Sequence, residues 1–232
     1  MLKRVFRENW LTRDPAHPGL ATTVALALLL AAGRLVEFPA SGELVFGRGE
    51  YWRAWTTLFV HSGPAHLLSN LVLFIPFAFV LTGYYGWFLF PFLGFLVGGL
   101  VNLAVLREMP AAISLVGASG VVYWMGAVWI TLAILVDRRE RLARRVLKGF
   151  GVAMLLYLPE GYRPEVSYVT HLYGFLAGIA CAVLYYYANR ATFRAAERYE
   201  YRYDFDAHWD PRLNGYGPEL PEEAPLDAES FK

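Results

Sequence analysis

The chain has 232 residues, of which 56% are hydrophobic and 16% aromatic, and its formal net charge is +1 at pH 7. Charged residues make up 18%, below the quarter that is typical of a soluble domain, so the composition predicts a protein that crosses a membrane several times. The small net charge gives no reason to expect a nucleic-acid partner, and a single cysteine, Cys181, excludes an intrachain disulfide.

Six apolar segments are expected to form an all-α membrane domain over residues 20–189. A polar, basic segment over 1–19 precedes them, and a polar tail over 190–232 follows. The fourth segment holds 20 residues without a charged side chain, about the length that crosses a hydrocarbon core of roughly 30 Å. The fifth is short, so it is expected to borrow residues from the basic loop before it or to lie tilted. The predicted spans are residues 20–38, 64–81, 86–106, 117–136, 146–158 and 166–188.

The first apolar segment has a second interpretation, as a secretory signal peptide, because the small residues Ala40, Ser41 and Gly42 follow it. The long polar leader, and the interruption by Arg34 and Glu37 before any cleavage site, favour a retained helix. A retained helix keeps the number of spans at six, on which the expected orientation depends.

Basic residues set that orientation. Four Lys or Arg residues precede the first span, six lie in the loop after the fourth, and Arg190, Arg194 and Arg198 follow the sixth, whereas the opposite loops hold few. The positive-inside rule therefore places both termini in the cytoplasm. Because no organelle-targeting peptide is visible, a prokaryotic cytoplasmic membrane is the expected location.

The tail over 190–232 has a different composition from the membrane domain. It carries 6 Lys or Arg residues and 10 Asp or Glu residues, together with four prolines. This predicts a solvated segment that is disordered beyond about residue 210. Its early part, 193–205, is rich in Tyr and Arg and has two interpretations: a segment on the membrane surface, or a helical extension that frays.

Polar side chains recur near the outer start of three spans. His66 and Asn70 lie four residues apart in the second span, Ser119 lies in the fourth, and His171 lies in the sixth. At a rise of 1.5 Å per residue, these groups fall within about 10 Å of one another in depth. A polar group at such a depth is costly unless it pairs or lines a wet cavity, so a single buried polar site is predicted.

The spacing on the fourth and sixth spans supports a shared site. Ser119 and Tyr123 are four residues apart on one helix face, and His171, Gly174 and Gly178 lie on one face of the sixth span. The two glycines have the spacing that lets helix backbones approach closely. Close approach is what a serine hydroxyl needs in order to lose its proton to an imidazole about 3 Å away.

With these residues in place, the sequence resembles the rhomboid intramembrane serine proteases. The resemblance covers the membrane core, about residues 20–189. Thr170 is a departure, because the family usually has alanine before the histidine, and a minor packing change is expected there. The motifs that carry the resemblance are His66-x-x-x-Asn70, Gly117-Ala118-Ser119-Gly120, His171-x-x-Gly174-x-x-x-Gly178 and Trp52-Arg53 in the first external loop.

The resemblance implies a rhomboid-like six-helix bundle in which Ser119 is the nucleophile and His171 the general base. Because no Asp or Glu lies within the fourth or sixth span, the expected unit is a dyad and not a triad. His66 and Asn70 are expected to donate to the oxyanion, and Tyr123 to pack on the histidine ring.

The remaining motif residues are expected to support the site. Gly117 and Gly120 flank the serine and leave it open to close approach by another backbone. Trp52 and Arg53 more simply hold the external loop than take part in chemistry. No cofactor is implied.

The resemblance also implies the kind of substrate, which is a transmembrane segment of another protein. Cleavage is expected near the outer end of that segment, where its helix can unwind and expose its carbonyls. Entry is expected between the second and fifth spans, and the pocket is expected to open outward beneath the loops 39–63 and 159–166. The oligomeric state does not follow from the sequence.

Each of these residues also has an interpretation without chemistry. Ser119 is a small residue suited to helix packing, Tyr123 suits a membrane interface, and His66, Asn70 and His171 suit hydrogen bonds between helices. The main alternative is therefore a catalytically silent rhomboid-like protein that binds membrane clients. Such relatives usually lack the serine or the histidine, so the presence of both favours a protease.

The sequence fits two other classes less well, a metalloenzyme and a transporter. His61, His66 and His171 are candidate metal ligands, but no HExxH motif and no carboxylate accompanies them at that depth, so no metal is expected. A six-span transporter predicts midplane charges or broken helices, and often an internal repeat, and the sequence gives no sign of these.

Overall fold

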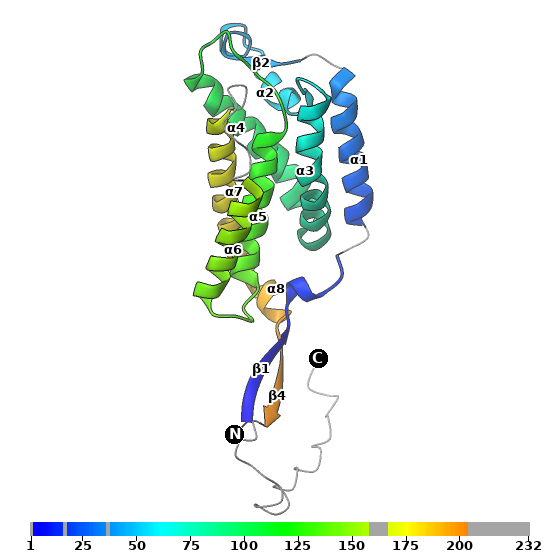
Figure 1. Ribbon diagram of the computed structural model, residues 1–232, viewed down its shortest axis with the longest axis vertical. Coiled ribbons are helices and arrows are strands. Elements are labelled where there is room, and N and C mark those ends of the chain that lie inside the picture. Colours follow the sequence, from blue (N-terminus) through cyan, green and yellow to red (C-terminus); the bar gives the residue numbers. More distant parts are fainter. Residues whose placement is uncertain (1, 16–17, 36–37, 158–166, 204–232) are drawn as a thin grey trace, which may run out of the picture. The chain divides into compact units, whose positions relative to one another are not determined.

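The computed structural model describes residues 2–15, 18–35, 38–157 and 167–203, and these fall into two compact units. One unit, residues 8–198, is the helix bundle (Figure 1). The other, residues 1–7 with 199–232, contains most of a two-stranded sheet of β1 (Leu2–Glu8) and β4 (Arg198–Tyr203). The loop 159–166 and the predicted disorder beyond residue 210 lie outside the described residues.

The sheet differs from the sequence-based expectation of a polar leader over 1–19 and a surface segment or fraying helix over 193–205. The helix α8 (Arg190–Ala195) extends the last span only briefly before β4 begins. In β4, tyrosines at 199, 201 and 203 alternate with other residues, which is the period-two pattern of a strand. Within this unit, the Phe6 and Tyr199 rings meet edge to face at 4.9 Å, and Arg7 pairs with Glu200.

Six helices of 15 residues or more occur in the described part of the chain. Four stretches are long and apolar enough to cross a membrane, Pro64–Tyr85, Phe88–Glu108, Ser119–Val136 and Tyr168–Ala188, which makes this an integral membrane protein. The second of these joins a short helical segment, η5 (Phe88–Leu93), to α4. The six helices are α1 (Pro18–Ala32), α3 (Pro64–Tyr85), α4 (Gly94–Glu108), α5 (Ser119–Val136), α6 (Leu142–Tyr157) and α7 (Tyr168–Ala188).

The helix α6 begins earlier than the fifth apolar run does. It starts at Leu142, inside the basic loop, so the helix carries Arg144, Arg145 and Lys148 in its first two turns. This is the borrowing of loop residues that the short apolar run predicted. Because of these charges and its length, α6 falls outside the four apolar spans.

The helix α5 is the centre of the bundle. It packs against α3, α4, α6 and α7, and its contact with α7 is the most extensive in the molecule (Figure 1). These neighbours bury much of its apolar surface, and Trp124, Met125, Val128 and Leu132 are all 1% exposed or less. The start of α5, where Ser119 lies, is thereby fixed by neighbours on several sides.

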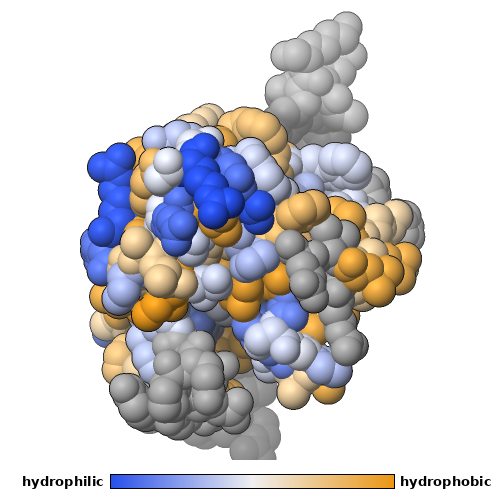
Figure 2. Space-filling model, turned by 90° about the horizontal axis from the view of Figure 1, so that it is seen from above, coloured by the Kyte–Doolittle hydropathy of each residue, from blue (hydrophilic) through white to orange (hydrophobic). Residues whose placement is uncertain are grey.

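Short elements cover one end of the bundle. The strand β2 (Ala40–Ser41) pairs antiparallel with β3 (Ser114–Leu115), which immediately precedes the start of α5. Figure 2 looks onto this end, where strongly hydrophilic residues lie beside apolar ones. The other short elements are η1 (Trp10–Thr12), η2 (Gly33–Leu35), η3 (Glu43–Gly47), α2 (Arg53–Thr56) and η4 (Thr57–Phe59).

Candidate active site

Ser119 is the first residue of α5 and follows a turn that requires glycine. Gly117 has a φ of +110°, a conformation that residues with a side chain rarely adopt. Its N–H donates to the carbonyl oxygen of Thr57 at 3.1 Å, and the Thr57 hydroxyl donates to the carbonyl oxygen of Leu115. The N-cap residue, Ala118, has no side chain that could occupy the first N–H groups of α5. The serine is therefore held on a fixed turn beside open backbone donors.

The loop that carries Trp52 and Arg53 is joined to this turn through β2 and β3. Arg53 donates from Nη1 to the carbonyl oxygen of Pro39 at 3.2 Å, and its Nε pairs with Glu50. Its guanidinium also lies 4.7 Å from the ring centroid of Trp52, which meets the ring of Phe38 edge to face. These contacts join the loop that carries Trp52 and Arg53 to the residues just before β2.

Glycines bring the backbone of α7 against that of α5. A Cβ atom built on Gly174 would lie 2.2 Å from the carbonyl oxygen of Gly120, and one on Gly178 would lie 2.5 Å from that of Trp124. On the opposite side of the contact, a Cβ on Gly120 would lie 2.8 Å from Cγ2 of Thr170. Only hydrogen fits at these positions, so the two helices meet at the level of the predicted nucleophile and base.

The ring of His171 is held in a stack of three rings. It is 6% exposed and stacks on Tyr123 with centroids 4.0 Å apart, and Tyr123 stacks in turn on Tyr157 at 4.3 Å. Nδ1 of His171 is buried and has no hydrogen-bond partner among the described residues. Because Tyr123 lies one turn after Ser119 on α5, the stacked imidazole lies along the helix face that carries the serine. Among the described residues, the ring contacts with Tyr123 are therefore what holds the imidazole in place.

His66 and Asn70 lie beside the turn before the serine. A Cβ on Gly117 would lie 2.8 Å from Cε1 of His66 and 3.7 Å from Nδ2 of Asn70. Asn70 is 5% exposed, and its amide donates to the carbonyl oxygen of His66 at 3.2 Å. An amide has two N–H donors, so Asn70 retains a second donor for another acceptor. Both side chains thus border the backbone of the serine turn.

His61 supports His66 and does not join the serine. Its ring lies 5.2 Å from that of His66, and its Nδ1 lies 3.2 Å from the carbonyl oxygen of Phe59. Burial, with a smaller contribution from the neighbouring His66, lowers the pKa of His61 to about 4. The His61 ring is therefore neutral at neutral pH.

Thr170 fits the site as a minor variation in packing. Its methyl group lies against Gly120, and its hydroxyl lies 2.7 Å from Oγ of Ser167, which caps the start of α7. The hydroxyl is thereby satisfied within the helix end. The β-branched side chain also occupies part of the α5–α7 contact.

Two residues of the site were not anticipated from the sequence. Tyr157, at the end of α6, supplies the outer ring of the stack, and Thr57 links the two chain segments that precede the serine. No spacing rule joins either residue to its partner, because the partners lie on different elements. The only available signal was an aromatic residue at the end of the short fifth run.

Polar side chains from α3, α5 and α7 gather at one end of a bundle of apolar helices, which defines a polytopic membrane protein with a buried polar site. The chain belongs to the rhomboid family, because the family model described as the rhomboid domain matches residues 48–188. Two relatives agree with this assignment. The chain is 33% identical over 148 residues to Rhomboid-like protease 3 of Toxoplasma gondii, and 26% identical over 153 residues to Rhomboid protease GluP of Bacillus subtilis (strain 168).

These matches cover 60% and 64% of this chain. They span 54% of the Toxoplasma gondii protein and 29% of the Bacillus subtilis protein, so the chain corresponds to only part of each relative. Because one relative is from Toxoplasma gondii, the comparisons do not support a specifically prokaryotic origin.

Proposed function

We propose that this protein is an intramembrane serine protease that cleaves transmembrane segments of other proteins near the outer face of the membrane. The observation that carries the proposal is the glycine-mediated contact of α7 with the start of α5, together with the stacking of the His171 ring on Tyr123, one turn after Ser119. Membership of the rhomboid family supports the same conclusion, as do the two relatives, which are named as a rhomboid-like protease and a rhomboid protease.

In the proposed reaction, Oγ of Ser119 attacks the carbonyl carbon of the scissile peptide bond while His171 accepts the hydroxyl proton. His171 then donates that proton to the departing amine, which leaves an acyl-enzyme ester on Ser119. A water molecule, deprotonated by the same imidazole, hydrolyses the ester. No carboxylate orients the base in this scheme, so the stack on Tyr123 takes over the orienting role.

The negative charge on the tetrahedral intermediate requires donors that are in place beforehand. The N–H of Ser119 lies at the start of α5, where backbone donors are unpaired and the helix dipole favours an anion. Asn70 supplies an amide N–H, and His66 lies beside the same turn. We assign these three groups to the oxyanion.

Asn70→Ala is expected to lower kcat by about 10²- to 10³-fold with little change in KM, because one oxyanion donor is removed. Asn189→Ala is a matched control, since both amides donate to the carbonyl four residues earlier in their own helix, Asn70 at 3.2 Å and Asn189 at 2.9 Å. The control should leave kcat unchanged. Equal effects of the two substitutions on cleavage of a single-span substrate in liposomes would remove Asn70 from the oxyanion site.

Tyr157→Ala is expected to slow labelling of Ser119 by a fluorophosphonate probe by roughly 2- to 10-fold, the range that corresponds to the loss of one aromatic stacking contact. A small probe needs no lateral entry, so its rate reports the alignment of Tyr123 and His171. Tyr157→Phe keeps the stack, and it removes a hydroxyl that is buried without a partner among the described residues. It should label at the original rate and unfold at the same temperature or higher. Slower labelling with phenylalanine than with alanine would contradict this role of the ring.

The fluorophosphonate probe also tests the proposal as a whole. Wild-type protein is expected to be labelled covalently, and Ser119→Ala protein is not. Absence of labelling in the folded wild type, with membrane clients still bound, would identify a catalytically silent rhomboid-like protein instead.

The proposed topology has six spans with both termini in the cytoplasm. The helices α1 and α6 supply the two spans beyond the four apolar stretches, and the basic residues around the start of α6 lie at the opposite end of α5 from Ser119. Because α6 packs chiefly against α5, substrate entry is proposed between α3 and α6. The active site then faces the outer side, in a multi-pass protein of the cytoplasmic membrane.

A further inference from the structure

A cavity of about 410 Å³ lies between α5 and α6, at the end of these helices remote from Ser119. Its deeper wall is apolar and includes Trp129 and Ile134 of α5 and Val152 of α6. From Asp137 at the end of α5 to Trp129 the helix rises about 12 Å, so the cavity extends roughly two helical turns toward the membrane interior. The apolar part of the cavity near Trp129 is therefore suited to a hydrocarbon chain.

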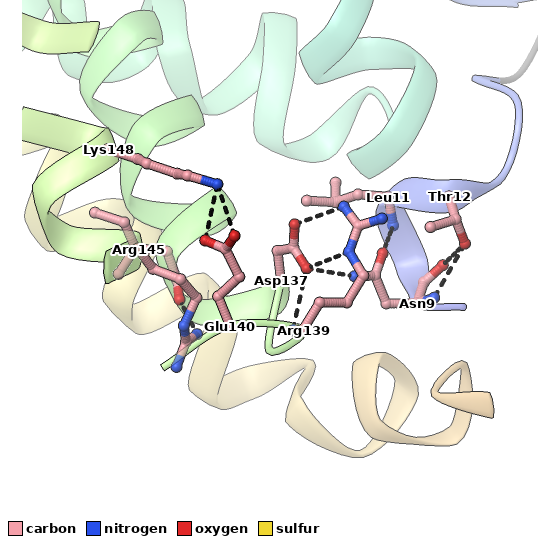
Figure 3. A network of polar contacts seen from close by, with 9 residues as sticks. Asn9, Leu11, Thr12, Asp137, Arg139, Glu140, Arg145 and Lys148 are labelled. Carbon is pink, nitrogen blue, oxygen red and sulfur yellow. Dashed lines mark hydrogen bonds and ion pairs between the residues drawn. The ribbon is translucent and has the colours of Figure 1, made fainter. Parts of the chain in front are cut away.

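The rim of this cavity carries charged side chains, which Figure 3 shows at close range. Asp137 accepts from Nε and Nη2 of Arg139 at 2.8 and 2.7 Å, which holds the pKa of its carboxyl below the usual range. Nζ of Lys148 lies 2.8 Å from Glu140. Glu140 is shared, because Nη1 of Arg144 lies 3.7 Å from it as well, so one carboxylate faces two cations there. Arg145 is a further cation on the rim.

Arg145 has no carboxylate partner among the described residues. Its Nη1 donates to the carbonyl oxygen of Ile134, and its Nε is buried with no hydrogen-bond partner in the described part of the chain. A buried donor of a charged group without an acceptor is costly, so the position favours an added anion. The surrounding segment 137–148 reinforces this preference, because it holds six basic and two acidic residues.

We propose that this cavity binds an anionic phospholipid from the bilayer. The phosphate would lie at Arg145 and Lys148, and an acyl chain would run along the apolar wall toward Trp129. A basic rim above an apolar cleft between two membrane helices is the arrangement that recognises an anionic headgroup with its attached chain. A soluble phosphate compound would satisfy the cations and leave the apolar depth of the cavity unfilled, so the lipid fits better.

The bound lipid would connect α6 to the central helix. Contacts of α6 are made chiefly with α5, and at the cavity they include the close approach of Gly149 to Ile134. A lipid that contacts both helices would fix the basic end of α6 while its other end holds Tyr157 in the ring stack. This inference concerns binding only, and it stands whether or not Ser119 is catalytic.

Native mass spectrometry of the full-length protein in detergent, with equal amounts of phosphatidylglycerol and phosphatidylcholine, tests the proposal. The wild type is expected to retain phosphatidylglycerol preferentially. Arg145→Gln with Lys148→Gln should lower that retention by roughly tenfold, because two of the cations facing the phosphate are lost. Lys148→Gln alone, at a side chain that is 64% exposed, should give part of the loss without threatening the fold.

A matched control separates a local site from general attraction. Arg138→Gln with Arg141→Gln makes the same change in charge in the same segment, and neither residue lines the cavity. Arg138 pairs with Glu197, which also lies outside the lining, so this variant should leave retention unchanged. Equal losses from the two double variants, or no preference for phosphatidylglycerol, would overturn the site. Displacement of the lipid by excess inorganic phosphate would show that the cations bind the anion alone and would overturn the lipid assignment.

Discussion

Ser119→Ala is expected to abolish cleavage of a tagged single-span substrate in liposomes, with kcat/KM falling by at least about 10⁴-fold. The hydroxyl is the only group on the serine turn that can form the acyl-enzyme, so no neighbouring side chain replaces it. His171→Ala should have an effect of similar size, because the serine then has no base on its helix face. The double variant should be no worse than either single one, since the two groups act as a unit.

Cys181→Ala provides the control for this experiment. Cys181 is the other candidate nucleophile on the base-bearing helix, but it lies ten residues after His171, about 15 Å along α7. The substitution is expected to leave cleavage and probe labelling unchanged. Cleavage that survives Ser119→Ala but is lost with Cys181→Ala would reject the proposed dyad.

Gly174→Ala is expected to lower both stability and activity. Its Cβ would lie 2.2 Å from the carbonyl oxygen of Gly120, which is backbone and cannot rotate away as a side chain would. The helices α5 and α7 must separate to relieve this overlap, at a cost of about 1–3 kcal/mol in the free energy of unfolding. A displacement of His171 from Ser119 by about 1 Å should lower kcat by about 10²-fold.

Gly151→Ala is the matched comparison, because a Cβ at that position of α6 meets no described atom within 4 Å. It should keep full activity and gain up to about 1 kcal/mol, since alanine favours the helix more than glycine does. Thermal unfolding in one detergent and the rate of probe labelling measure both effects. A Gly174→Ala protein that unfolds and labels like the wild type would show that the α5–α7 contact is not needed for the site.

The stack of Tyr157, Tyr123 and His171 gives the site a feature that a serine–histidine–aspartate triad lacks. In a triad, a carboxylate holds the base by a directional hydrogen bond, whereas here Nδ1 of His171 is buried without a partner among the described residues. The orientation of the His171 ring therefore depends on the position of the outer ring, Tyr157, which α6 carries. A shift of α6, such as binding of the proposed lipid at its other end could cause, would therefore change the orientation of the His171 ring.

Much of the membrane core could be predicted because its signals are periodic and local. The positions of α3, α5 and α7 follow from long apolar runs, and the common depth of Asn70, Ser119 and His171 follows from a fixed rise per residue. The glycine spacing on α7 predicted a close helix contact, and the structure has it at Gly120. Strand pairing of β1 with β4 escaped prediction because its partners lie about 190 residues apart.

The sequence by itself determined the four long apolar stretches and which polar side chains lie near their ends and on one helix face. The tertiary structure alone decided what surrounds those side chains: the link from Thr57 to the serine turn, the outer ring of Tyr157, and the charged cavity between α5 and α6. The reason is physical. Periodicity and rise describe one helix at a time, whereas a contact between two elements depends on their separation and rotation, which no single segment encodes.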